Sequence, residues 1–169
     1  MTTLLLLFID LCRLRRGPQD VPASRFLMML TAGGYFVIGL AVSLLEQPPG
    51  LAILSAAVDT LMLAALAWLS LWIIGKTARF TQTYTALAGI GILFGLMGWP
   101  LVAFLQGLPQ GQGSSLSLLL LGLVIWNIVV IGHILRHALG LMMWAASGLA
   151  LFYVYLSIRV MSALYIAGT

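Results

Sequence analysis

The stretch LSLLLLGLVIWNIVVIGHIL, Leu116–Leu135, contains no aspartate, glutamate, lysine or arginine. Its length matches the requirement of a membrane-crossing α-helix, about 20 apolar residues at about 1.5 Å each. A strand of a membrane β-barrel would alternate apolar and polar residues, and the run Leu118–Val124 does not alternate. The stretch therefore predicts a transmembrane helix.

Four further apolar stretches of similar length occupy most of the remaining chain. Of the 169 residues, 62% are hydrophobic and 7% are charged, whereas about 25% of the residues of a typical soluble domain are charged. The mean hydropathy is +1.13. We therefore expect an all-α polytopic membrane helix bundle of about five transmembrane helices, formed by residues 26–169. The four further predicted spans are Phe26–Leu45, Leu51–Ile74, Tyr84–Leu105 and Leu139 to about Ile158.

Residues 1–25 form a separate N-terminal segment. The part Met1–Arg16 predicts a short helix that lies in the membrane interface, because it is too short to cross the bilayer. Its expected apolar face consists of Leu4, Leu5, Phe8 and Leu11. A linker interrupted by prolines follows and leads into the first span.

The basic residues gather on one side of the predicted bundle. Seven of the eight precede the first span or follow the second and fourth spans, and only Arg159 lies near the other side. The loops 46–50 and 106–115 contain no lysine or arginine. By the positive-inside rule we expect a bacterial inner-membrane protein with a cytoplasmic N-terminus and a periplasmic C-terminus. The seven residues are Arg13, Arg15, Arg16, Arg25, Lys76, Arg79 and Arg136.

Two polar residues lie inside predicted spans. Asp59 is about 12 Å from the outer start of the second span, where a carboxylate costs at least about 2.5–3.5 kcal/mol and should face the bundle interior. Asn127 lies mid-way along the fourth span, and the two side chains could hydrogen-bond if these helices are neighbours. Asp59 either holds helices together, which we favour, or serves as a proton relay, a cation relay or a ligand contact.

The third span also carries a pair of glycines one helical turn apart, Gly91 and Gly95. Small residues at this spacing let two helices approach closely in a membrane. The pair therefore predicts a helix-packing site.

His133 and His137 are four residues apart, so both imidazoles lie on one helical face. That spacing suits a metal pair or a haem ligand, but a metal site needs further ligands. We therefore expect no metal and no cofactor. The residues expected to contact lipid headgroups at this interface are Arg13, Arg15, Arg16, Lys76, Arg79, His133, Arg136 and His137.

Several functional classes find no support in the sequence. The basic residues form no continuous stripe with aromatic residues, which argues against nucleic-acid binding. Neither a G-x-S-x-G nucleophile motif nor a G-x-x-x-x-G-K phosphate loop is present. The single cysteine, Cys12, excludes an internal disulfide. We therefore expect a protein that is not an enzyme.

Two short segments suggest a family. The segment 16–22, RGPQDVP, is a proline-broken entry into the first span, and the segment 75–83, GKTARFTQT, resembles the G…F-x-Q-T entry of bacterial Yip1-domain proteins. With five spans, the chain resembles a small Yip1-like membrane protein over nearly its whole length. Of the D-L-Y-G-P signature of eukaryotic members only Gly17-Pro18 is present, which argues against a role in vesicle trafficking or with a small GTPase. The resemblance implies no catalytic residues.

Together these features predict a non-enzymatic membrane protein that acts as a scaffold, an assembly factor or a lipid-organising factor. Its expected partners are membrane lipids and either another membrane protein or a second copy of the chain. Two alternatives stay open. One is a transporter or channel component in which Asp59 lines a path, and the other is a haem- or quinone-associated membrane anchor that uses His133 and His137.

Overall fold

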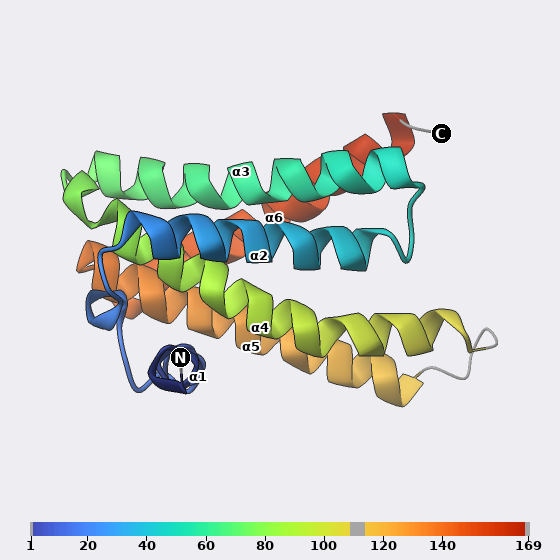
Figure 1. Cartoon of the computed structure of the whole chain (residues 1–169), viewed down its shortest axis with the longest axis horizontal. Helices are drawn as coiled ribbons and strands as arrows, with labels where there is room; N and C mark the ends of the chain where they lie inside the picture. The colour runs from blue at the N-terminus through green and yellow to red at the C-terminus, as the bar shows by residue number, and fades with distance from the viewer. Residues whose placement is uncertain (1, 109–113, 168–169) are drawn as a thin grey trace.

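The computed structural model describes residues 2–108 and 114–167, which form six α-helices and two short 3-10 helices (Figure 1). This part of the chain contains no β-strand, which confirms the all-α prediction. In chain order the elements are α1 (Thr2–Cys12), η1 (Pro18–Asp20), α2 (Arg25–Ser43), α3 (Pro49–Ile73), η2 (Thr77–Arg79), α4 (Phe80–Gln106), α5 (Ser114–Leu139) and α6 (Met143–Ala167).

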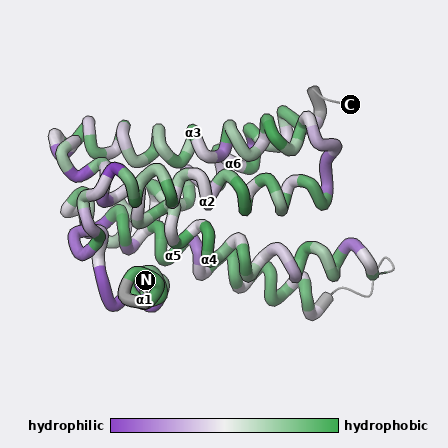
Figure 2. The backbone as a smooth tube through the Cα atoms, viewed as in Figure 1, coloured by the Kyte–Doolittle hydropathy of each residue, from purple (hydrophilic) through white to green (hydrophobic). Residues whose placement is uncertain are grey.

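The five helices α2 to α6 correspond to the five predicted spans, and each is long and apolar enough to cross a membrane. Hydrophilic residues gather toward the two ends of the bundle, and the helices between them are mostly hydrophobic (Figure 2). Of the predicted outer loop 106–115, positions 109–113 lie outside the described residues.

The start of α2, the α3–α4 connection and the α5–α6 connection all lie at one end of the bundle, on the left in Figure 1. This end carries Arg25, Lys76, Arg79 and Arg136, and we call it the basic end. The α2–α3 connection lies at the opposite end, which we call the far end. The helix ends that lie next to these basic residues are therefore all at the same end of the bundle.

A glycine in the left-handed backbone conformation follows the end of α3 and of α5. Gly75 has φ 72°, and the amides of Gly75 and Lys76 donate to the carbonyls of Trp72 and Leu71. This is the Schellman arrangement that ends a helix, here α3. A side chain at position 75 would be strained, because L-residues rarely adopt this conformation.

The α5–α6 boundary differs from the prediction. The fifth span was expected to begin at Leu139, whereas Leu139 is the last residue of α5 and α6 begins at Met143. Gly140 has φ 74°, and its amide donates to the Arg136 carbonyl. A glycine just after the last helical residue is a common helix stop, and at position 140 it separates the two spans.

Helix α1 lies across the other helices, so that Figure 1 shows it nearly end-on. Leu11 is completely buried and Phe8 is 8% exposed, and both belong to the core shared with α4 and α5. The prediction was wrong in one detail. The helix ends at Cys12 instead of Arg16, because Leu14 adopts the left-handed conformation (φ 59°). Leu5 of the predicted apolar face is exposed on the protein surface.

Helix α4 forms the centre of the bundle. It packs against α1, α2, α3 and α5, and every residue from Thr83 to Ile90 is buried. Toward the far end, α4 and α5 lean away from α2 and α3 (Figure 1). There the indole Nε1 of Trp99 donates to the Ala41 carbonyl at 3.1 Å, which holds α4 to α2.

Candidate functional site

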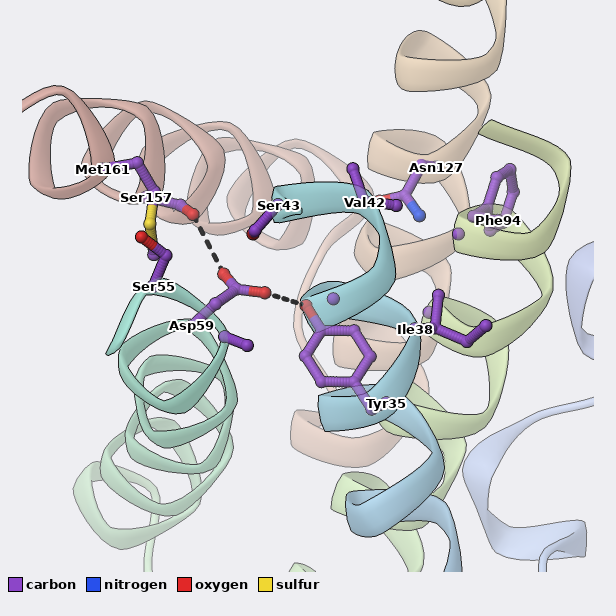
Figure 3. Close-up of a pocket in the computed structure, with 14 residues that line it drawn as sticks. Tyr35, Ile38, Val42, Ser43, Ser55, Asp59, Phe94, Asn127, Ser157 and Met161 are labelled. Atoms are coloured by element: carbon purple, nitrogen blue, oxygen red, sulfur yellow. Dashed lines mark hydrogen bonds between the residues drawn. The ribbon is translucent and has the colours of Figure 1, made fainter. Parts of the chain in front are cut away.

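The carboxyl group of Asp59 lies among hydroxyl groups from two other helices, α2 and α6 (Figure 3). Its Oδ2 accepts a hydrogen bond of 2.5 Å from the Tyr35 hydroxyl of α2. Its Oδ1 accepts one of 3.1 Å from Ser157 Oγ of α6 and lies 3.5 Å from the Tyr153 hydroxyl. Asp59 therefore links α3 to α2 and α6.

The partners of the Asp59 carboxylate are hydroxyl groups and not a positively charged side chain. Within residues 2–108 and 114–167, the one ion pair joins Asp10 to Arg16 (3.2 Å), and no cation pairs with Asp59. Inserting a carboxylate at the membrane centre costs about 2.5–3.5 kcal/mol, and a hydrogen bond to a charged group returns about 1.5–3 kcal/mol. The two shorter bonds to Asp59 are therefore of the right size to offset its insertion.

Asp59 faces a cavity of about 340 Å³ between the helices. All five long helices line it. Representative lining residues are Tyr35 and Val42 from α2, Ser55 from α3, Phe94 from α4, Asn127 from α5 and Met161 from α6 (Figure 3). The wall is mostly apolar, and among the described residues Asp59 is the one formally charged residue that lines it. A mostly apolar cleft with a few polar groups is typical of small-molecule sites, which measure about 300–1,000 Å³.

Asn127 lines the same cavity as Asp59, as expected for two inward-facing polar residues. The hydrogen bonds to the Asp59 carboxylate come from hydroxyl groups, however, and none comes from Asn127. The difference follows from the helix arrangement, because α3 packs mainly beside α2, α4 and α6 and touches α5 little.

The predicted glycine pair adjoins this site. The Tyr35 ring of α2 occupies the space that a Cβ at Gly91 would need, and Ile38 of α2 does the same at Gly95. The glycines thus accept side chains of α2 into the surface of α4. Because Gly91 makes room for Tyr35, it also places the hydroxyl group that bonds to Asp59.

A second hollow of about 550 Å³ opens at the far end and is lined by Glu46, Gln47, Met161, Ser162 and Tyr165. Met161 lines both this hollow and the Asp59 cavity. A hydrogen bond of 2.8 Å from Ser55 Oγ to Gln47 Oε1 also connects the two walls. The Asp59 cavity therefore adjoins the far end of the bundle and not the basic end.

Some basic side chains that were expected at lipid headgroups have partners within the chain. Lys76 Nζ donates to the Leu139 carbonyl at 2.6 Å, and Arg79 reaches the Ala138 carbonyl at 3.5 Å. These carbonyls belong to the last turn of α5, whose partial negative charge favours cations. Arg16 is exposed and pairs with Asp10. By contrast, Arg13, Arg15 and Arg136 are exposed and form no ion pair with the described residues.

His133 and His137 lie side by side at the basic end, with ring centroids 4.3 Å apart. His133 Nε2 lies 3.1 Å from the Arg16 carbonyl, and His137 Nδ1 lies 2.9 Å from the His133 carbonyl. Each of these nitrogens must carry a proton to donate to a carbonyl. In the described part of the chain, no third His, Cys, Asp or Glu joins the pair to form a metal-binding group. His133 instead ties the N-terminal segment to α5.

The partners of Asp59 were missed in the sequence, although two signals were present. Tyr35 lies in the middle of a span, whereas membrane tyrosines are enriched at the two interfaces. Tyr153 and Ser157 are four residues apart and therefore share one face of α6. Both signals mark polar groups that need a partner inside the bundle.

The chain matches no protein-family model, no curated protein and no solved structure. The resemblance to Yip1-domain proteins therefore stays a prediction.

Proposed function

We propose that this chain is a multi-pass protein of the bacterial inner membrane, with its N-terminus in the cytoplasm and its C-terminus in the periplasm. The five apolar helices support the membrane location. The distribution of lysine and arginine supports the orientation, because all but Arg159 belong to the N-terminal segment or to connections at the basic end. In this orientation the hollow lined by Glu46 opens toward the periplasm.

We further propose that the protein binds a small solute in the Asp59 cavity, as a transporter or as the binding component of one, and that it is not an enzyme. One observation carries this proposal: a single carboxylate faces a cavity to which all five long helices contribute. A carboxylate that only held helices together could be enclosed by packed side chains. Asp59 instead is partly exposed to a space large enough for a ligand.

The competing proposal is the scaffold role expected from the sequence, in which Asp59 only links α2, α3 and α6. The two proposals differ in whether water-soluble molecules reach the cavity. Ser43 of α2 lines the cavity, and no side-chain hydrogen bond of the described residues involves it, so Ser43→Cys introduces a thiol reporter. The native cysteine is removed first by Cys12→Ser.

The test is labelling of intact cells with a membrane-impermeant, thiol-reactive reagent. Solute binding predicts that Ser43→Cys reacts, as Ser162→Cys should at the hollow of the far end, where Ser162 is exposed. Gly148→Cys on α6 is the negative control, because it lies between the ends of a predicted span. A reactive Ser162→Cys beside an unreactive Ser43→Cys would exclude access to Asp59 and favour the scaffold.

A second test separates folding from function. Asp59→Asn keeps the size and hydrogen-bonding capacity of the side chain, whereas Asp59→Leu leaves the surrounding hydroxyls without their acceptor. We expect Asp59→Asn to melt near the wild-type temperature yet fail to complement a deletion strain, and Asp59→Leu to melt lower. Asp10→Asn, which removes the same charge on α1, is the matched control. Full complementation by Asp59→Asn would favour the scaffold.

A further inference from the structure

The Asp59 cavity and the hollow beside it share one electrostatic character. Asp59 lines the first and Glu46 lines the second, and no lysine, arginine or histidine of the described residues lines either one. Arg159, the one basic residue on α6, lies on neither wall. Acidic groups in a cleft with low-dielectric walls raise the local concentration of cations.

The composition of the cavity wall is poorly suited to a small hydrated ion. Apart from the Asp59 carboxylate, the wall combines apolar and small residues with neutral polar side chains. The apolar residues include Ile38, Val42, Phe94 and Met161, and the neutral polar ones are Tyr35, Ser43, Ser55, Asn127 and Ser157. Calcium takes about six to eight oxygen ligands, and magnesium keeps several waters in a strict octahedral arrangement. The hydroxyl groups of Tyr35 and Ser157 already donate to Asp59, and that of Ser55 donates to Gln47. With one formal negative charge on the wall, the site suits a monovalent cation better than calcium or magnesium.

The aromatic rings favour a different kind of cation. Tyr35 contributes its ring to the cavity next to the carboxylate, and Phe94 lies on the wall formed by α4 (Figure 3). Aromatic faces attract quaternary and protonated amines, by about 0.5–2 kcal/mol per contact. The charge of Asp59, the aromatic rings and the apolar wall are therefore complementary to one amphipathic ligand.

We propose that the solute bound in the Asp59 cavity is an organic monovalent cation with an apolar body, such as a substituted ammonium ion. This inference rests on the proposed solute-binding function. The ammonium group lies at the Asp59 carboxylate, which also accepts hydrogen bonds from Tyr35, Ser157 and Tyr153. The attraction between the two charges holds the ligand and needs no N–H donor. The apolar body lies against the wall that includes Val42, Phe94 and Met161, and Asn127 offers a polar contact on α5.

The first experiment uses the Ser43→Cys, Cys12→Ser protein in detergent and leaves Asp59 intact. A cationic methanethiosulfonate should react faster than an anionic one of similar size. Benzyltrimethylammonium should slow the reaction in a saturable manner. Benzyl alcohol and benzenesulfonate, the neutral and anionic probes, should not protect. Ser162→Cys, which is exposed outside the cavity, should gain little protection from any probe.

The second experiment measures benzyltrimethylammonium binding by calorimetry. Asp59→Asn should weaken binding by roughly thirtyfold or more, as expected when one member of a desolvated charge pair is removed. Asp10→Asn should bind as the wild type does. If Asp59→Asn does not fold, the protection measured with Asp59 intact decides the question.

The outcomes separate this inference from the function on which it rests. An unreactive Ser43→Cys overturns both. If Ser43→Cys reacts but benzyltrimethylammonium gives no protection, the cavity is accessible and the organic cation is wrong. Equal protection by benzyl alcohol indicates a purely apolar pocket, and protection by sodium chloride alone indicates an inorganic cation site. Each of these two results also overturns the inference.

Discussion

The ring of Tyr35 on α2 lies where any side chain at Gly91 on α4 would have to be placed. The hydroxyl group of the same tyrosine donates a hydrogen bond to Asp59 on α3. Gly91 on α4, which has no side chain, therefore fixes the position of the Tyr35 hydroxyl group on α2. Through this hydrogen-bond donor it also affects the surroundings of the Asp59 carboxylate on α3.

Gly91→Ala should therefore displace Tyr35. Overpacking of a well-packed site costs about 1–3 kcal/mol, and we expect a lower melting temperature together with weaker binding in the Asp59 cavity. Gly122→Ala on α5 is the matched control. A Cβ at position 122 meets nothing within 4 Å, and alanine is the better helix former by about 1 kcal/mol. Equal melting temperatures for the two variants would contradict the steric role of Gly91.

Lys76→Met should destabilise the basic end. It removes the ammonium group that binds the Leu139 carbonyl, at an expected cost of about 1–2 kcal/mol. Thermal unfolding in a detergent without anionic lipid measures this effect. Arg136→Met serves as the control, because Arg136 is exposed. If Lys76 only contacted lipid headgroups, Lys76→Met would have no effect in that detergent.

Cys12 should react slowly with thiol reagents. Burial raises the pKa of its thiol to about 11, from 9.0, because the thiolate loses solvation. The thiolate is the reactive form, so alkylation at pH 7.5 should accelerate about 100-fold when the protein is denatured. In the folded protein the rate should rise about tenfold per pH unit up to about pH 11. A pH dependence that levels off near 9 would show that the thiol is exposed to water.

Reporter fusions test the orientation. A fusion near Arg79 should report the cytoplasm, and fusions at Gln47 and Gln110 should report the periplasm. The physical reason is the positive-inside rule, which the segregation of the basic residues satisfies. The reverse pattern would overturn the proposed orientation and place the hollow lined by Glu46 on the cytoplasmic side.

The long helices were predictable because their signal is local. An apolar run of about 20 residues is visible without knowledge of neighbouring helices, and each predicted span overlaps one of the helices α2 to α6. The misplaced start at Leu139 had a local signal as well, namely Gly140 in the position of a helix stop. The apolar residues on both sides of this glycine concealed the boundary.

The candidate site was predictable only in part. The insertion cost of a carboxylate indicated that Asp59 faces inward, and it does line the central cavity. Its partners depend on which helices are adjacent, and one sequence does not contain this information. Asn127 had a suitable depth but lies on α5, whereas the donors Tyr35 and Ser157 lie on α2 and α6.

The contacts of the N-terminal segment bear on how the chain is assembled during synthesis. Gln82 donates to the Val21 carbonyl across 61 positions, and His133 binds the Arg16 carbonyl across 117. Helix α1 precedes α4 and α5 in the chain, so the α4 and α5 surfaces that cover Leu11 are synthesised after it. Until then α1 must shelter its apolar face in the lipid interface. Helix α1 is therefore made before the five long helices but reaches its native contacts only after α5 is in place.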